Sequence, residues 1–134
     1  MEIKINKSYE EYLKYRNIII ICAGDNSLHH KKKWFSKSRQ YVLCINYYGD
    51  SQEIHDIYKK NSDIFVASKG PKWVIIRNIL LNRKVNLKIL RDFNFITFPD
   101  DDLDISVSKW NKLFKIGEKY KLDLFQPALI DNGR

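Results

Sequence analysis

The chain has 134 residues, with 24 Lys plus Arg, 16 Asp plus Glu and a formal net charge of +8, and this length suits a single domain of roughly 100–200 residues. Hydrophobic residues make up 44% and aromatic residues 13% of the sequence, which excludes an intrinsically disordered chain. Its two cysteines are too few for a disulfide-rich secreted scaffold or a four-cysteine zinc site.

The first part of the chain is expected to hold one helix and two strands. A short helix over Tyr9–Tyr15 opens the chain. The β-branched run Asn17–Ala23 (NIIIICA) predicts a strand that is buried on both faces, and Tyr41–Asn46 predicts a second strand. Each strand ends in a polar turn, at residues 24–27 and 47–50, where the residue types favour a loop.

The middle of the chain predicts a helix, a strand and a second helix. Ser51 suits the N-cap of a helix over Gln52–Lys60, and Ile64–Ala67 predicts the third strand. Pro71 stands where the first position of the next helix is expected, a favoured place for proline. Two adjacent apolar stripes follow it, so we expect this helix to be largely buried, with Trp73 as a core anchor.

The last third of the chain predicts two further strands and a helix between them. Phe93–Phe98 is the fourth strand and Leu124–Leu129 a short last one. The helix between them is capped by Ser106 or Ser108 and has Trp110 as its core anchor. Strands that alternate with helices predict an α/β fold with a mainly parallel sheet. No apolar run approaches the ~20 residues that span a bilayer, and no signal-peptide pattern is present, so we expect a cytoplasmic protein without a transmembrane segment.

An acidic turn follows the fourth predicted strand, although residues 1–91 as a whole are net positive. It contains Asp100, Asp101, Asp102 and Asp104. Such a cluster costs repulsion unless a cation lies there, and Mg²⁺ or Mn²⁺ takes one or two carboxylates and completes its shell with water and phosphate. The alternative is a solvated acidic loop before the next helix. Because ligands bind beyond the carboxyl ends of strands in α/β sheets, the position favours a site.

Three further residues are candidates for binding a nucleotide ligand. Lys69 and Lys72 flank a Gly-Pro turn at a predicted helix start, where an ammonium group suits a diphosphate. The alternative is a pair of solvated turn lysines. Asp25 follows the first strand and would lie near a bound nucleotide, or else it serves as a turn-forming residue.

The segment from His29-His30 through Lys31–Lys33 to Arg39 is interpreted as a mobile basic loop. Its dense charge and two aromatic residues make it the best candidate for a nucleic-acid contact, the least favoured of the functions considered. We therefore expect no nucleic-acid partner. Cys22 and Cys44 lie in apolar strands and are expected to be inert core thiols.

Three stretches in order resemble the domain of unknown function 707 family, within glycosyltransferases of the A-type fold. The first, Lys69–Trp73 (KGPKW), opens a helix, and the second, Phe98–Leu103 (FPDDDL), carries a strand into an Asp-rich motif. The third, Leu122–Leu129 (LDLFQPAL), follows the next helix. The resemblance extends from about Asn17 to the end of the chain.

The resemblance implies a three-layer α/β/α sandwich with a Rossmann-like sheet, and a metal-dependent glycosyltransferase domain. Its donor is a nucleotide-diphosphate sugar, and the unknown acceptor belongs to glycan or polysaccharide synthesis. The Asp-x-Asp motif maps onto Asp100 and Asp102 as ligands of Mn²⁺ or Mg²⁺, with Asp101 beside the substrate. Tyr48 and Asp50 fall where A-type enzymes contact the base or ribose.

Members of the family continue beyond the third stretch into an acceptor-binding half. We therefore expect residues 1–134 to form one nucleotide-sugar-binding domain, with its core over 17–130, as the N-terminal donor half of a larger catalytic domain. No catalytic base is assigned. The alternative is a truncated, non-catalytic domain that binds a nucleotide or a partner protein.

Overall fold

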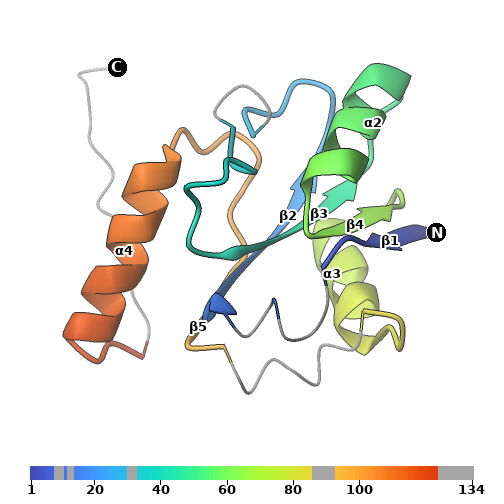
Figure 1. The fold of residues 1–134 in the computed structure, drawn as a ribbon. Helices are drawn as coiled ribbons and strands as arrows, with labels where there is room; N and C mark the ends of the chain where they lie inside the picture. The colour runs from blue at the N-terminus through green and yellow to red at the C-terminus, as the bar shows by residue number, and fades with distance from the viewer. Residues whose placement is uncertain (8–10, 12–13, 30–32, 86–92, 124–134) are drawn as a thin grey trace.

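The computed structural model describes residues 1–7, 11, 14–29, 33–85 and 93–123 (Figure 1). The described strands are β1 (Glu2–Ile5), β2 (Asn17–Ala23), β3 (Val42–Tyr47), β4 (Ile64–Ala67) and β5 (Phe95–Thr97). The described helices are α2 (Gln52–Asn61), α3 (Lys72–Leu81) and α4 (Val107–Lys119). Strands and helices alternate after β3, which confirms the α/β class.

The described strands form one mixed sheet in the order β1-β4-β3-β2-β5. β2, β3, β4 and β5 are parallel to one another, which confirms the mainly parallel sheet. β1 pairs with β4 in the antiparallel direction, with Glu2 opposite Ala67 and Ile5 opposite Ile64. β1 was not predicted from the sequence. Parallel alignment brings the carboxyl ends of the other four strands to one edge of the sheet, where the polar turns lie.

The core lies on both faces of the sheet because side chains alternate along each strand. Ile18, Ile20 and Cys22 of β2 pack on one face with buried residues of α3. Ile19 and Ile21 pack on the other face, together with residues of α2 and α4. The five apolar side chains from Ile18 to Cys22 are at most 9% exposed, which confirms a strand buried on both faces.

Serine caps fix where two helices begin. Ser51 accepts a hydrogen bond from the Ile54 amide at the start of α2, as predicted. Ser106 accepts one from the Lys109 amide at 3.3 Å, so Ser106 rather than Ser108 caps α4. Pro71 is the residue before α3 and not its first helical residue.

Helix α3 is less buried than its apolar sequence suggests, so the predicted burial was wrong in part. Ile75, Ile76 and Ile79 are buried against the sheet, whereas Trp73 is 63% exposed and is no core anchor. The reason is geometric, because a helix that lies on a sheet buries only the side chains that face it. In α4, Trp110 is buried at 2% exposure, as expected.

Other predicted elements differ in extent or lie outside the described residues. The fourth predicted strand, Phe93–Phe98, is shorter in the structure, where β5 covers Phe95–Thr97. The predicted strand Leu124–Leu129 lies outside the described residues, as do most residues of the predicted helix Tyr9–Tyr15. Within the part of the chain that is described, no helix has the length and apolar character needed to span a membrane.

Candidate functional site

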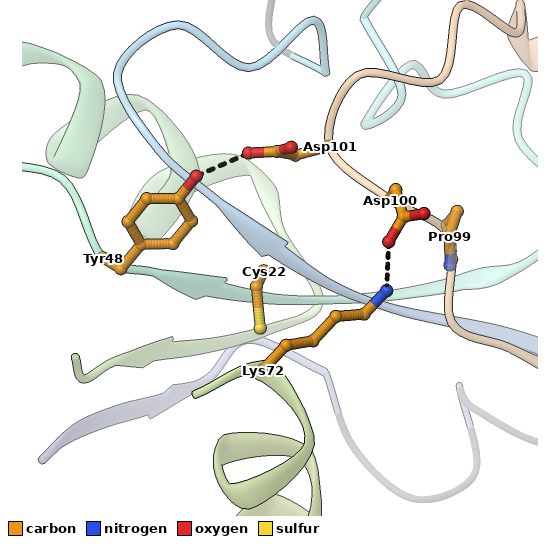
Figure 2. A pocket seen from close by; sticks show the side chains of 6 residues that line it. All are labelled: Cys22, Tyr48, Lys72, Pro99, Asp100 and Asp101. Carbon is orange, nitrogen blue, oxygen red and sulfur yellow. Dashed lines mark hydrogen bonds and ion pairs between the residues drawn. The ribbon is translucent and has the colours of Figure 1, made fainter. Parts of the chain in front are cut away.

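A small pocket of about 150 Å³ lies at the carboxyl edge of the sheet (Figure 2). It is lined by Cys22 of β2, Tyr48 after β3, Lys72 at the start of α3, and Pro99, Asp100 and Asp101 after β5. The fold thus gathers four predicted site residues, Tyr48, Lys72, Asp100 and Asp101, from three separate segments of the chain.

Asp101 is fixed by hydroxyl donors from two other turns. The Tyr48 hydroxyl donates to Asp101 Oδ2 at 2.5 Å, and Ser27 Oγ donates to the same oxygen at 3.2 Å. Ser27 Oγ also accepts from the Gly24 amide at 2.7 Å, which anchors the turn after β2. The hydrogen bond to Asp101, together with burial, raises the pKa of Tyr48 to about 12. Tyr48 is therefore a neutral donor at physiological pH.

Gly24 is the residue that allows the Tyr48 ring to reach this position. A Cβ at Gly24 would stand 2.7–2.9 Å from atoms of the Tyr48 ring and hydroxyl, closer than side chains pack. A larger residue would push the phenol out of reach of Asp101. The glycine after β2 is therefore part of the architecture of the pocket.

Asp100 faces the opposite side of the pocket and pairs with Lys72. The Lys72 ammonium lies 2.6 Å from Asp100 Oδ1 and donates to the Phe98 carbonyl at 3.2 Å. The Lys72 side chain is 26% exposed and that of Asp100 is 75% exposed. An ammonium that is held at the pocket wall and faces solvent is positioned to meet an incoming anion.

Cys22 forms part of the pocket wall, a position that was not predicted from the sequence. It is the penultimate residue of β2 and so lies close to the carboxyl edge, a signal that the strand boundaries already contained. Burial raises the pKa of the Cys22 thiol, against a smaller opposing effect of the Lys72 ammonium. The thiol is thus protonated at neutral pH, and a protonated thiol is a poor nucleophile. Cys44 is fully buried.

Asp25 supports a neighbouring turn and does not line the pocket. Its carboxylate accepts from the Tyr47 hydroxyl, from the Asp50 amide at 3.0 Å and from the Ser51 amide at 3.2 Å. The bond from Tyr47 and then that from Asp50 lower the pKa of Asp25. A Cβ at Gly49 would collide with this carboxylate. These contacts are those of the turn-forming role that was the alternative for Asp25.

Lys69 and Asp50 form an exposed ion pair, close in sequence to the pocket residues Lys72 and Tyr48. The Lys69 ammonium lies 2.5 Å from Asp50 Oδ1, and the two side chains are 66% and 85% exposed. Neither residue lines the pocket. An exposed pair of this kind contributes little to stability, so both side chains are available to a ligand.

Asp102, the second proposed metal ligand, is exposed and lies outside the pocket lining. Within the described ranges, no three His, Cys, Asp or Glu side chains gather as a metal cage would require. Two carboxylates, Asp100 and Asp102, are nevertheless compatible with a hard cation that takes its other ligands from water and phosphate. These residues therefore fit a cation that has at most two protein ligands and fills its other positions with water and phosphate.

The described residues of the basic segment form turns and no helix or strand, as expected of a loop, but parts of the segment are built into the core. His29 is fully buried, with its ring 4.3 Å from that of Trp34, and Trp34 Nε1 donates to the Ile105 carbonyl at 2.7 Å. Arg39 is 8% exposed and forms an ion pair with Asp63. Trp34 and Arg39 are therefore not available to a nucleic acid, while Lys31 and Lys32 lie outside the described residues.

Comparison of the chain with protein-family models, with curated proteins and with solved structures found no match.

Proposed function

We propose that this domain binds a nucleotide-diphosphate sugar at the carboxyl edge of its sheet and is the donor-binding part of a metal-dependent glycosyltransferase. One observation carries the proposal. The acidic turn after β5 meets Lys72, from the start of α3, and Tyr48, from the turn after β3, around one pocket. The three-layer A-type fold and the resemblance to the domain of unknown function 707 family belong to the same proposal.

Lys72 is the residue assigned to the diphosphate. Its ammonium lies at the first residue of α3, the end of the helix that favours negative charge. In the structure, it neutralises Asp100 at 2.6 Å. When a diphosphate binds, the ammonium exchanges this carboxylate for phosphate oxygens, and the exposed Lys69, three residues before Lys72, adds a second positive charge.

Asp100 and Asp102 are the residues that would hold Mn²⁺ or Mg²⁺. Such a cation, when bound, neutralises the negative charge that develops on the diphosphate leaving group. The Lys72 ammonium already lies against Asp100, and a second cation beside it is repelled unless phosphate is present. We therefore expect the protein to bind Mn²⁺ weakly alone and more tightly together with a nucleotide.

Tyr48 and Asp50 are assigned to the base or ribose of the nucleotide. Tyr48 is 40% exposed and its hydroxyl is fixed by Asp101, so its ring presents a rigid surface. The backbone amide of Asp50 donates a hydrogen bond to Asp25, and the carboxylate of Asp50 pairs with Lys69. Asp25 thus acts through Asp50, as a positioning residue.

Calorimetry with UDP-glucose, UDP-N-acetylglucosamine and GDP-mannose, each with and without Mn²⁺, tests the proposal. We expect Mn²⁺-dependent binding of at least one donor, and we expect Asp100→Ala, Asp102→Ala and Lys72→Met to weaken it tenfold or more, the equivalent of about 1.4 kcal/mol. Two variants are matched controls. Lys84→Met changes an exposed lysine beyond the C-terminal end of α3. Glu118→Ala changes a carboxylate that lines a different hollow, next to Phe95 at the start of β5.

The outcomes separate the candidate functions. Absence of binding in every condition, or binding that is unchanged in the Asp100 and Asp102 variants, would contradict the proposal. Metal-dependent donor binding without release of the sugar to any acceptor or to water would instead identify a non-catalytic nucleotide-binding domain.

A further inference from the structure

Trp73 is a large apolar side chain that the fold leaves in solvent. The other two tryptophans of the chain, Trp34 and Trp110, are 0% and 2% exposed, whereas Trp73 is 63% exposed. It lies in the first turn of α3, directly after the pocket residue Lys72. The indole does not line the pocket but lies next to it, with its ring centroid 5.1 Å from the ammonium of Lys72.

The ring of Trp73 is held in place although it is exposed. Its edge-to-face contact with Phe98 has a centroid distance of 5.7 Å, and the Lys72 ammonium lies 5.1 Å from its centroid. Phe98 directly precedes Pro99 and Asp100 of the pocket. Because two neighbours already restrict the ring, a ligand that stacks on it loses little additional side-chain entropy.

Polar groups adjoin the indole on the side of the pocket. The same Lys72 ammonium that lies near the ring is 2.6 Å from Asp100 Oδ1. The site therefore combines a flat apolar surface with a cation and a carboxylate. A pyranose ring has a matching character, with a face of C–H groups and a rim of hydroxyls that both donate and accept hydrogen bonds.

We propose that Trp73 is a stacking platform for a pyranose ring at the mouth of the pocket. The proposal rests on the proposed function and adds to it the residue that recognises the sugar. The ring belongs either to the donor, next to the diphosphate at Lys72, or to a carbohydrate acceptor. Both sources present the same chemistry to the indole.

Tryptophan fluorescence with iodide as the quencher tests this directly. Because Trp34 and Trp110 are buried, iodide should quench mainly the emission of Trp73. The probes are UDP and GDP, the donors UDP-glucose and GDP-mannose, and the free oligosaccharides maltotriose and cellotriose. We expect a sugar-bearing probe, but not UDP or GDP, to protect the emission from iodide.

Affinities of the variants complete the test. Trp73→Ala should weaken the binding of the protecting probe by about fivefold to tenfold, the range of an aromatic contact, and leave that of the nucleoside diphosphate unchanged. Trp73→Phe should restore part of the loss. Leu81→Ala removes an equally exposed apolar side chain from the other end of α3 and should have no effect.

The different probes distinguish a failure of the stacking platform from a failure of the donor site. Protection by UDP-glucose or GDP-mannose assigns the ring to the donor, and protection by an oligosaccharide assigns it to an acceptor even if no nucleotide binds. If UDP or GDP binds in an Asp100-dependent manner but no sugar protects Trp73, the platform is refuted and the donor site stands. If no probe binds, both are refuted.

Discussion

At the scale of single residues, neighbouring carboxylates in the acidic turn have different environments. Asp100 pairs with the Lys72 ammonium, whereas Asp101 accepts from the Tyr48 and Ser27 hydroxyls. The sequence placed both in one acidic cluster but gave no indication of these partners, which lie at least 28 positions away. The turn is thus organised by its neighbours on the sheet edge and not by its own sequence.

The pKa of Tyr48 is the first prediction at this scale. Asp101→Asn should lower it from about 12 toward the usual value of 10, because the carboxylate that stabilises the protonated phenol is gone. Tyrosine-selective ¹³C labelling and an NMR titration above pH 9 would measure the change.

Asp25→Asn is the matched control, because Asp25 accepts from Tyr47 and not from Tyr48. It should lower the pKa of Tyr47, which is raised to about 12 first by burial and then by Asp25. A Tyr48 titration that does not respond to Asp101→Asn would show that the contact is absent in solution.

At the scale of elements, strand β1 and helix α2 are joined by a cluster of charges. His55 Nε2 lies 3.0 Å from Glu2 Oε2 of β1, and His55 Nδ1 lies 2.9 Å from Asp56 Oδ1. Lys59 also pairs with Glu2, at 2.5 Å. The bonds to Asp56 and Glu2 raise the pKa of His55 above its usual 6.5, although burial opposes them.

This cluster predicts a pH dependence of stability. Because the pKa of His55 is raised on folding, its contribution is complete below pH 6.5 and is lost as the pH rises through the raised value. The lowered pKa values of Glu2 and Asp56 mean that their contributions are lost below about pH 4. The cluster therefore stabilises most between these limits.

Urea unfolding of the wild type and of His55→Gln at pH 5.5 and pH 8 measures the effect. We expect the variant to be less stable than the wild type at pH 5.5, by on the order of 0.5 kcal/mol because the groups are partly exposed, and closer to it at pH 8. An equal difference at both pH values would show that packing of the ring on Phe65, and not its charge, is responsible.

Local sequence patterns predicted the elements with strong periodicity and missed those that depend on distant contacts. β2 has six consecutive apolar residues, Ile18–Ala23, and was predicted with its correct bounds. β1 is only four residues with two charges, and its partner β4 lies about 60 positions away. Trp73 was wrongly predicted to be buried, because two adjacent apolar stripes on α3 do not show which face of the helix packs against the sheet.

At the scale of the whole molecule, Asp63 connects three separate parts of the chain. It is 1% exposed and accepts from the Leu43 amide at 2.8 Å. Its Oδ1 lies 2.5 Å from an Arg39 guanidinium nitrogen and 3.1 Å from the Lys7 ammonium. The N-terminal segment, the segment before β3 and the start of β4 therefore meet at one buried carboxylate.

Asp63→Ala should destabilise the domain by about 3–5 kcal/mol, because it leaves the Arg39 guanidinium buried without its carboxylate. Chemical denaturation monitored by circular dichroism measures the loss. Asp50→Ala removes a carboxylate from an exposed pair and should change the stability little. If the two variants are equally stable, the Asp63 cluster does not hold these segments together.

The candidate site was predictable in outline from the same topology. Parallel strands predict that their polar turns meet at one edge, and Tyr48, Lys72, Asp100 and Asp101 do meet there. The turn-forming role of Asp25 was predictable from its place after β2, but its partners were not, and neither was the buried role of Arg39. Each depends on groups that only the folded chain brings near: the Asp50 amide for Asp25, and Asp63 for Arg39. The pocket beside Cys22 was not predictable for the same reason, because residues distant in the sequence form its other walls.

The order of the strands in the sheet has a consequence for folding during synthesis on the ribosome. β2 pairs with β3 on one side and with β5 on the other, so among the described strands none lies beside its second edge until Phe95–Thr97 has been synthesised. During that interval, the apolar strand NIIIICA has an unpaired edge. Unpaired edges of apolar strands tend to pair with strands of other chains and so cause aggregation. Nascent chains should therefore bind chaperones strongly until β5 emerges, which crosslinking of stalled translation products would reveal.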